Sequence, residues 1–305
     1  MTQAVLRYTG TTHQRTGGIT ATPVHGLYLV RRTAPSALEH AVEQPLVCLV
    51  LQGRKRVAMG SRTVSYAAGD TMIVTANVPT ASRISQASIA QPYLAVALEL
   101  DPAVITDLVL GLPGRDAPPA TPDVTDVTDT GDEDDLRDAV RRLVRLLDRP
   151  ESLAVLKEGL VREIHHWLLR GRQGAAIRQL GLPDSHARRI ARAVAILRAE
   201  PTQPVRIERL AAAAGMGRSA FHLHFRAITS LSPLQFHKHL RLMQARRLIL
   251  SLGKSVSQVA FELGYESASQ FSREYARMHG QPPTKDKRAA SERFGAASAA
   301  RIAKR

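Results

Sequence analysis

Between residues 24 and 100 the apolar positions form short runs that are rich in β-forming residues and are separated by Gly and Pro. The runs cover residues 26–30, 46–51, 56–59, 62–66, 71–75 and 93–100. Gly60-Ser61 predicts a two-residue hairpin between two of them, and Gly69-Asp70 predicts a turn before another. Many short strands at this close spacing predict a β-sandwich or a small β-barrel.

The pattern becomes helical at Asp101-Pro102, where Asp101 is suited to cap a helix and Pro102 to begin it. Residues 111–135 are rich in Pro, Thr and Asp and predict a flexible surface connection. Two amphipathic helices follow, and residues 148–151 join them as a hairpin. Their apolar stripes are Leu136, Val140, Leu143, Val144 and Leu147, then Leu153, Leu156, Leu160, Ile164 and Trp167. Five apolar residues on each helix exceed what a linker needs, so we expect self-association through residues 136–169.

From residue 184 onward the periodicity is helical throughout, with short turns marked by Gly, Ser or Pro. The predicted helices cover residues 187–200, 207–214, 219–229, 233–251, 256–263 and 268–279. Ser232 followed by Gln235, and Ser255 followed by Gln258, predict two capping boxes. The helix over 233–251 would be about 28 Å long, at 1.5 Å per residue.

This helical part contains an internal repeat. Residues 207–216 (IERLAAAAGM) match 256–265 (VSQVAFELGY), and 221–225 (FHLHF) match 271–275 (FSREY) with one residue inserted. Each copy is a short apolar helix, a turn led by Gly and a second helix, which is the helix-turn-helix plan. One such pattern would be weak evidence, but two copies in register predict two units on one long connecting helix. Adjacent major-groove faces of DNA lie ~34 Å apart, so the connecting helix could hold the units in successive grooves.

The charge supports a polyanionic partner. The chain carries a net charge of +15, and residues 184–305 account for 22 Lys and Arg against 8 Asp and Glu, a net of +14. Residues 1–183 carry the other 20 against 19. Such one-sided charge favours nucleic acid as the partner, with an anionic membrane surface as the second candidate.

Several other classes of protein are disfavoured. The single Cys48 excludes a disulfide framework and a Cys-rich metal site, and its apolar neighbours indicate a buried side chain. The first ten residues lack a secretory signal and no stretch is apolar enough to span a membrane, so we expect a cytoplasmic protein. Paired histidines occur at 165–166, 222–224 and 237–239. The members of each pair are one or two residues apart on a predicted helix, so they point to different faces and are poorly placed to bind one metal ion together. A metal-binding cupin would need a clustered His-x-His and a carboxylate on neighbouring strands, and only His40 and Glu43 lie near the strands. We therefore expect no metal, no cofactor and no catalytic residues.

In the repeat and in the helix that connects its two copies, the sequence resembles the AraC/XylS family of transcription regulators. The segments that carry the resemblance are LAAAAGMGRSAFHLHF (210–225), SPLQF (232–236), RLMQARRL (241–248), GYESASQFSREY (264–275) and GQPP (280–283). Upstream, PLVCLVLQG (45–53) and QPYLAV (91–96) are similar to the cupin-like N-terminal domain of one branch of that family. Gly217 stands where Ser is expected as a helix cap, a change that costs only a few tenths of a kcal/mol.

Pattern and resemblance together predict an α+β multidomain fold. We expect a cupin-like regulatory β-barrel domain over residues 1–110, and an acidic linker with the helical hairpin over 111–180. An all-α DNA-binding domain with two helix-turn-helix units is expected over 184–286. Residues 287–305 are expected to form a disordered basic tail.

The second helix of each unit is expected to face DNA with the side opposite its core residues. Phe221 and Phe225, like Phe271 and Tyr275, are four apart and predict the core side. The expected DNA contacts are Arg218, Ser219, His222 and Arg226 in the first unit, and Ala268, Ser269, Ser272, Arg273 and Arg277 in the second. Arg273 is the best candidate to read a base, although a phosphate contact fits it equally well. Arg246 and Arg247 are expected to contact the DNA backbone or to lie on the solvated surface.

The expected function is therefore sequence-specific transcription regulation on a double-stranded DNA operator. We expect a homodimer, RNA polymerase as a partner if the protein activates, and a small-molecule effector of unknown identity that controls it through the N-terminal domain. One alternative is a cupin-type metal-dependent enzyme fused to a DNA-binding domain. The other is a non-specific nucleoid-type DNA-binding protein.

Overall fold

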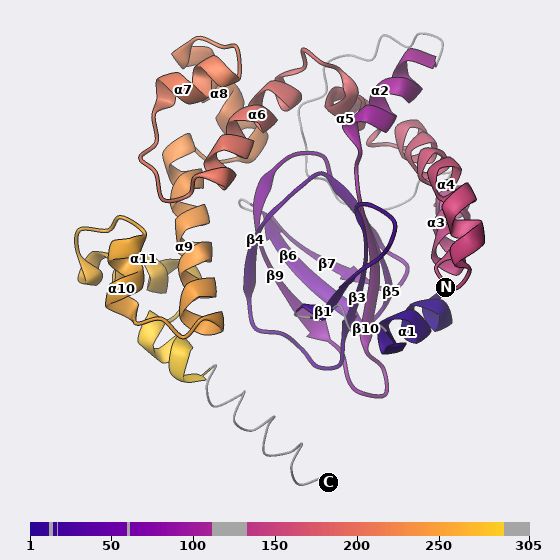
Figure 1. Ribbon diagram of the computed structural model, residues 1–305, viewed down its shortest axis with the longest axis horizontal. Coiled ribbons are helices and arrows are strands. Elements are labelled where there is room, and N and C mark those ends of the chain that lie inside the picture. Colours follow the sequence, from indigo (N-terminus) through magenta and orange to yellow (C-terminus); the bar gives the residue numbers. More distant parts are fainter. Residues whose placement is uncertain (12–14, 17, 60–61, 112–132, 290–305) are drawn as a thin grey trace, which may run out of the picture.

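The computed structural model describes residues 1–11, 15–16, 18–59, 62–111 and 133–289. A short helix opens the chain and strands follow it (Figure 1). These elements are α1 (Thr2–Thr11), β1 (Arg15–Thr16), β2 (Ile19–Ala21), β3 (Leu27–Arg32), β4 (Glu39–Glu43), β5 (Leu46–Gln52), β6 (Arg54–Met59), β7 (Arg62–Ala67), β8 (Thr71–Val74), β9 (Val78–Gln86) and β10 (Tyr93–Glu99).

The rest of the described chain is helical. The helices are α2 (Pro102–Gly111), α3 (Glu133–Leu146), α4 (Pro150–Arg170), α5 (Gly174–Gly181), α6 (His186–Ala199), α7 (Ile207–Ala213), α8 (Arg218–Thr229), α9 (Pro233–Ser251), α10 (Val256–Glu262) and α11 (Ala268–His279). The expected α+β fold, with strands first and a helical part bearing two helix-turn-helix units last, is confirmed.

The strands form two antiparallel sheets. One has the order β1-β2-β3-β10-β5-β8 and the other the order β4-β9-β6-β7. Residues from both sheets, among them Val50, Val57 and Tyr93, share one buried cluster. The sheets therefore pack face to face without closing into a full barrel, which corrects the expected barrel in this detail. Cys48 is buried in the same cluster, and burial raises the pKa of its thiol to about 11.

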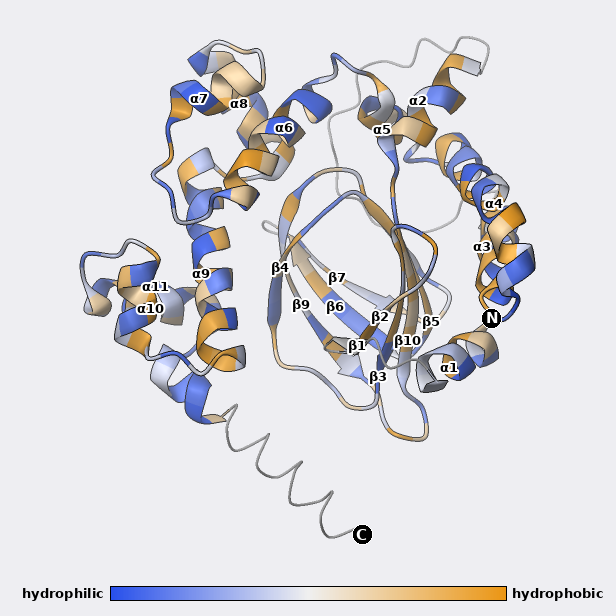
Figure 2. Ribbon diagram, viewed as in Figure 1, coloured by the Kyte–Doolittle hydropathy of each residue, from blue (hydrophilic) through white to orange (hydrophobic). Residues whose placement is uncertain are grey.

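Apolar sequence explains the central strands. β5 and β10 are paired with each other and are buried along most of their length, as expected for the continuous runs at 46–51 and 93–98. Hydrophobic residues accordingly gather along these strands in Figure 2. No pattern in the sequence predicted α1, β1, β2, β4, β9 or α5. Gly60-Ser61, most of the expected linker (112–132) and most of the expected tail (290–305) lie outside the described residues.

Helices α3 and α4 form the expected hairpin, and it covers the six-stranded sheet (Figure 1). Leu143 and Val144 share a buried cluster with Leu29 and Val96 of the sheet. All five apolar residues of the α3 stripe are buried within this chain, so that stripe is not available to a second copy. The exposed apolar residues of the hairpin lie on α4, where Val155 is 78% and Leu156 51% exposed.

Helix α9 carries the two helix-turn-helix units, with α7 and α8 at its beginning and α10 and α11 toward its end (Figure 1). Its start is fixed by the predicted capping box, because the Ser232 hydroxyl accepts from the Gln235 N–H and the Gln235 side chain accepts from the Ser232 N–H. The Ser255 hydroxyl caps α10 by accepting from the Gln258 N–H. At 1.5 Å per residue, α9 is about 28 Å long.

Candidate nucleic-acid interface

Both units are built on the same turn. In the first, the Met216 N–H donates to the Ala211 carbonyl at 2.9 Å, and Gly215 has a φ of +62°. In the second, the Tyr265 N–H donates to the Ala260 carbonyl at 2.9 Å, and Gly264 has a φ of +73°. A left-handed residue at this point favours Gly because it has no Cβ to clash with the backbone. The repeat read from the sequence is thus a repeat of backbone geometry.

The recognition helices α8 and α11 pack through matching residues. Phe221 and Phe225 of α8 are fully buried, and so are Phe271 and Tyr275 of α11. The aromatic rings of each pair contact one another, with centroids 5.4 Å and 5.7 Å apart. These side chains fix which side of each helix faces its core, as the sequence predicted.

Helix α6 belongs structurally to the first unit, because it holds the turn. Arg189 donates from Nε to the Ala214 carbonyl at 2.7 Å and from Nη2 to the Gly215 carbonyl. Arg192 donates from Nε to the Ala213 carbonyl at 2.9 Å. These bonds satisfy carbonyls at the end of α7 that have no partner within the helix. Sequence reasoning assigned neither arginine a role.

Side chains of α9 hold the second unit. The Arg241 guanidinium lies 4.2 Å from the centre of the Tyr265 ring. Glu274 of α11 accepts from Lys238 Nζ at 2.9 Å and from the Tyr265 hydroxyl at 3.1 Å. Burial by itself raises the pKa of Glu274, but these hydrogen bonds outweigh it and leave the pKa below its usual value. Glu274 therefore stays ionised and ties the recognition helix to α9.

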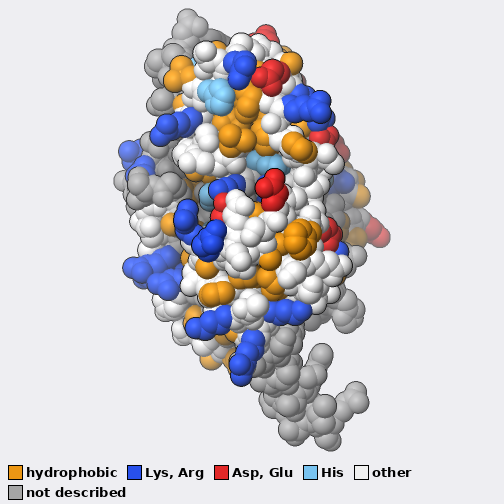
Figure 3. Space-filling model, turned by 90° about the vertical axis from the view of Figure 1, so that its left-hand side faces the viewer, with side chains coloured by type: hydrophobic (Ala, Val, Ile, Leu, Met, Phe, Trp, Pro, Cys, Tyr) orange, Lys and Arg blue, Asp and Glu red, His pale blue; other side chains and the backbone are white. Residues whose placement is uncertain are grey.

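The residues expected to contact DNA lie on the side away from these cores. All four expected contacts of the first unit are exposed: Arg218, Ser219, His222 and Arg226. In the second unit, Ser269, Arg273 and Arg277 are exposed, and Ala268 and Ser272 are half-buried. Arg218 also pairs with Glu208 at 3.2 Å. The face formed by α7, α8, α10 and α11 carries many Lys and Arg side chains, few acidic ones and some apolar ones (Figure 3). Whether each residue contacts DNA stays a prediction.

The exposed residues on the same sides of these helices that were not predicted include Leu223 on α8 and Gln270 on α11. The repeat held the signal for Leu223, because it has the same place relative to Phe221 that Arg273 has relative to Phe271.

Arg246 is not the backbone contact or surface residue that the sequence suggested. It donates from Nε to Asp286 at 2.8 Å and from Nη1 to the Leu38 carbonyl at 3.0 Å. Asp286 is fully buried and also accepts from the Tyr275 hydroxyl at 2.8 Å. Burial raises the pKa of Asp286, but hydrogen bonds from Tyr275 and Arg246 outweigh it and leave the pKa below its usual value. Arg246 thus links the second unit to the loop before β4.

A histidine pair strengthens that link between the sheets and the helical part. The rings of His40 on β4 and His279 on α11 pack nearly perpendicular to each other, with centroids 5.0 Å apart. Burial, together with the nearby Arg246, lowers the pKa of both imidazoles to about 4. Both rings are therefore neutral near pH 7.

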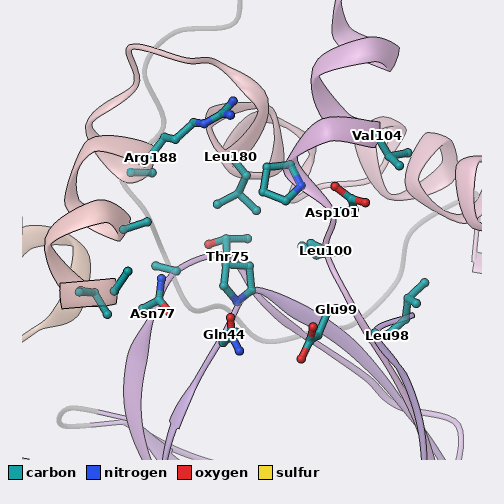
Figure 4. Close-up of a pocket in the computed structure, with 18 of the residues that line it drawn as sticks. Gln44, Thr75, Asn77, Leu98, Glu99, Leu100, Asp101, Val104, Leu180 and Arg188 are labelled. Atoms are coloured by element: carbon teal, nitrogen blue, oxygen red, sulfur yellow. The ribbon is translucent and has the colours of Figure 1, made fainter. Parts of the chain in front are cut away.

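A cavity of about 760 Å³ lies where the strand ends meet α4, α5, α6 and α8 (Figure 4). Gln44, Thr75 and Glu99 line the strand side, and Leu180 and Arg188 line the helical side. Its wall is mainly apolar, with charged side chains among the apolar ones. A smaller cavity of about 310 Å³ lies between the two sheets and reaches Cys48, Tyr93 and Arg198.

Among the residues that the structure describes, no three or more His, Cys, Asp or Glu side chains gather as a metal site would require. Nor is any of the described helices both long and apolar enough to cross a membrane.

Comparisons with known proteins match both parts of the chain. A family model described as AraC-type transcriptional regulator N-terminus matches residues 23–176, about half of the chain, and one described as helix-turn-helix domain matches residues 210–289. The chain is 26% identical over 154 residues to the virulence regulon transcriptional activator VirF of Yersinia enterocolitica, covering 49% of this chain and 55% of VirF. It is 32% identical over 94 residues to the HTH-type transcriptional regulator AlkR of Acinetobacter baylyi, covering 31% of each. The chain thus spans about half or less of the length of these relatives.

Among solved structures, apo ToxT of Vibrio cholerae is similar over 88% of this chain and 98% of its own, with a TM-score of 0.54. The two sequences are 10% identical, so the likeness is one of fold. It covers the strands and the helices together.

Proposed function

The chain belongs to the AraC/XylS family of transcription regulators, and on that premise we propose that it binds one specific double-stranded DNA operator through both helix-turn-helix units. Each recognition helix enters the major groove, and α9 sets the distance between the two. The DNA-binding part corresponds to residues 184–286, and residues 1–110 form the regulatory part.

The repeated turn is the observation that carries this proposal. Two units with the same hydrogen bond and the same left-handed Gly are held on one helix, and their recognition helices expose polar and basic side chains. Binding through two successive grooves doubles the number of base edges within reach. It also accounts for the concentration of positive charge after residue 184.

The test needs the operator sequence, which can be selected with the full-length protein. Duplexes are selected from a random pool by the full-length protein, and binding to the selected duplex is compared with a scrambled duplex at one fixed salt concentration. Specific regulators bind their sites at least about 10³-fold more tightly than other DNA. A selected duplex preferred by less than about tenfold would overturn the proposal and favour a nucleoid-type protein instead.

Each unit has its own control in this experiment. Ser219→Ala and Ser269→Ala each remove one exposed hydroxyl from one recognition helix. If both units read DNA, each variant weakens binding and alters the selected sequence in one half only. A protein that uses one unit would respond to one variant and ignore the other.

We propose further that a small amphiphilic molecule in the 760 Å³ cavity controls binding. The cavity touches both the strand ends and α6, which holds the turn of the first unit. Ala191 of α6 lines it, so Ala191→Trp would place a bulky side chain in part of the cavity. We expect the variant to bind DNA but to lose any response to compounds that raise the melting temperature of the parent protein.

The alternative function, a cupin-type metal-dependent enzyme, is tested by the metal content of the protein. Metal analysis of the purified full-length protein, before and after chelation, would report stoichiometric metal if the strand-rich part were a metalloenzyme. We propose that the protein is no enzyme, that it acts as a homodimer and that it contacts RNA polymerase if it activates. Transcription from the selected duplex in a purified system distinguishes activation from repression.

A further inference from the structure

Leu223 is an apolar side chain in the middle of the polar face of α8. Its side chain is 68% exposed, whereas the other large apolar side chains of the helix, Phe221, Phe225 and Ile228, are all buried. Leu223 is two residues from Phe221 and so points about 200° away from the core side of the helix. An exposed leucine gains nothing from the fold that a polar residue would not gain.

The neighbours of Leu223 place it inside the proposed DNA footprint. Ser219 is four residues before it and Arg226 three residues after it, so the three share one stripe along the helix. Both neighbours are exposed and are among the predicted DNA contacts. A side chain between them approaches the base edges when α8 lies in the groove.

The internal repeat gives a second, independent placement. Phe271 and Tyr275 of α11 correspond to Phe221 and Phe225 of α8, so Leu223 corresponds to Arg273. Both residues are exposed, and both units have the same turn and the same core packing. The position that carries a base-reading candidate in the second unit therefore carries a leucine in the first.

Leucine has no hydrogen-bonding group, which narrows what it can recognise. Of the features that base pairs present in the major groove, only the C5-methyl group of thymine is apolar, and apolar side chains contact it. We propose that Leu223 is a specificity-determining residue that packs on the 5-methyl group of one thymine of the operator. The inference rests on the proposed function, because it requires α8 to lie in the major groove.

This assignment makes the operator asymmetric. Leu223 selects an A·T pair by its methyl group, and the matching Arg273 is suited to the O6 and N7 atoms of guanine. The two units therefore read different bases through the same position, which fixes the direction in which the protein lies on the duplex.

The test removes the methyl group and nothing else. The tightest duplex selected by the full-length protein is resynthesised with each thymine replaced singly by deoxyuridine, and affinities are measured at one salt concentration. Burial of one methyl group contributes about a fourfold gain in affinity. We expect one deoxyuridine position to weaken the parent by about fourfold and to leave Leu223→Ala unaffected, because that variant has already lost the contact.

A matched control uses another exposed leucine. Leu110 on α2 is 82% exposed and lies outside both helix-turn-helix units, so Leu110→Ala should keep the full response to deoxyuridine. A second variant, Leu223→Arg, copies the second unit, and a duplex pool selected by it should carry guanine in place of that thymine.

The outcomes separate this inference from the function on which it rests. If the parent selects no preferred duplex, the proposed function fails. If it selects one, but each deoxyuridine affects the parent and Leu223→Ala by equal factors, Leu223 does not read a methyl group and the inference is overturned.

Discussion

Arg273 and Arg247 are both exposed and basic, but they differ in what their helices can reach. Arg273 is two residues past the buried Phe271 on α11, so it points away from the core of its unit. Arg247 is on α9, the helix that connects the units. A guanidinium that reaches a base edge reads sequence, and one that reaches a phosphate only adds affinity.

Arg273→Ala should therefore cost about 1–3 kcal/mol of binding free energy on the selected duplex and relax the preference at one or two base pairs. Arg247→Ala, the matched control, should weaken all duplexes equally and reduce the salt slope by about one. Binding isotherms on the selected duplex, on single mismatches and on random DNA measure both effects. Should Arg273→Ala weaken every duplex by the same factor, Arg273 is a phosphate contact.

The His40–His279 pair makes the docking of β4 on α11 sensitive to pH. Burial and Arg246 lower the pKa of both rings to about 4, with His239 also beside His40 and Asp286 beside His279. An unfolded histidine titrates near 6.5, so between about pH 6.5 and 4 the unfolded chain binds more protons than the folded one. The free energy of unfolding should therefore fall as the pH drops through this window and should be insensitive to these groups above it.

Urea unfolding at about pH 7.5 and pH 5 tests the contribution of the pair. The double variant His40→Phe/His279→Phe keeps two aromatic rings and removes both titrating groups. We expect the parent to lose more unfolding free energy than the variant between the two pH values. Equal losses would mean that other groups set the pH dependence.

At the scale of elements, Asp286 joins α9 and α11 to the helical segment over residues 283–289. Its carboxylate is fully buried and Arg246 is mostly buried. Asp286→Ala leaves the Arg246 guanidinium without its carboxylate partner, which should lower the free energy of unfolding by about 3 kcal/mol. Glu266→Ala, an exposed acidic residue in the same part, should change it by less than about 0.5 kcal/mol. Chemical unfolding of both variants gives the comparison, and similar small losses would contradict it.

The helical elements were predictable because their signals are local. Helices α9 and α10 begin with recognisable caps at Ser232 and Ser255, and each recognition helix has aromatic residues four positions apart on its buried side. β9 was missed because its buried face includes Thr80 and Ser82, which hide the alternation of Val78 and Ile84. α5 was missed because it begins and ends with Gly, which disfavours helices.

One part of the candidate site was also predictable from the sequence, and another part was not. The recognition helices and their core residues followed from the repeat, because the repeat preserves register. The roles of Arg246 and Arg189 could not be read from the sequence. Their partners, the Leu38 carbonyl and the Gly215 carbonyl, are backbone atoms far along the chain that leave no pattern in residue type.

At the scale of the whole molecule, the charge after residue 184 predicts how binding responds to salt. Of the net +14, residues 184–286, where the two units lie, carry 16 Lys and Arg against 7 Asp and Glu, a net of +9, and residues 287–305 carry the remaining +5. If the domain neutralises about six to ten phosphates, affinity should fall by about 10³–10⁵ between 50 and 200 mM salt. Titrations of the selected duplex at several salt concentrations measure the slope. A nearly flat response would show that the charge serves solubility and not DNA binding.

Self-association is the second prediction at this scale. The α3 stripe is used within the chain, so the exposed Val155 and Leu156 of α4 are the apolar residues of the hairpin left for a second copy. Replacing both with Glu should give a monomer that keeps its fold, because neither is buried. Sedimentation at micromolar concentration compares variant and parent. A parent that is already monomeric would contradict the prediction.

Helix α6 presents Arg188 and Ala191 to the 760 Å³ cavity and Arg189 to the turn of the first unit. If the proposed occupant binds there and DNA binding shifts α6, the occupant binds the DNA-bound and the DNA-free protein with different affinities. Thermodynamic linkage makes this coupling reciprocal, so the operator changes the affinity for the occupant by the same factor by which the occupant changes the affinity for the operator. In that sense the DNA is itself an effector of the cavity.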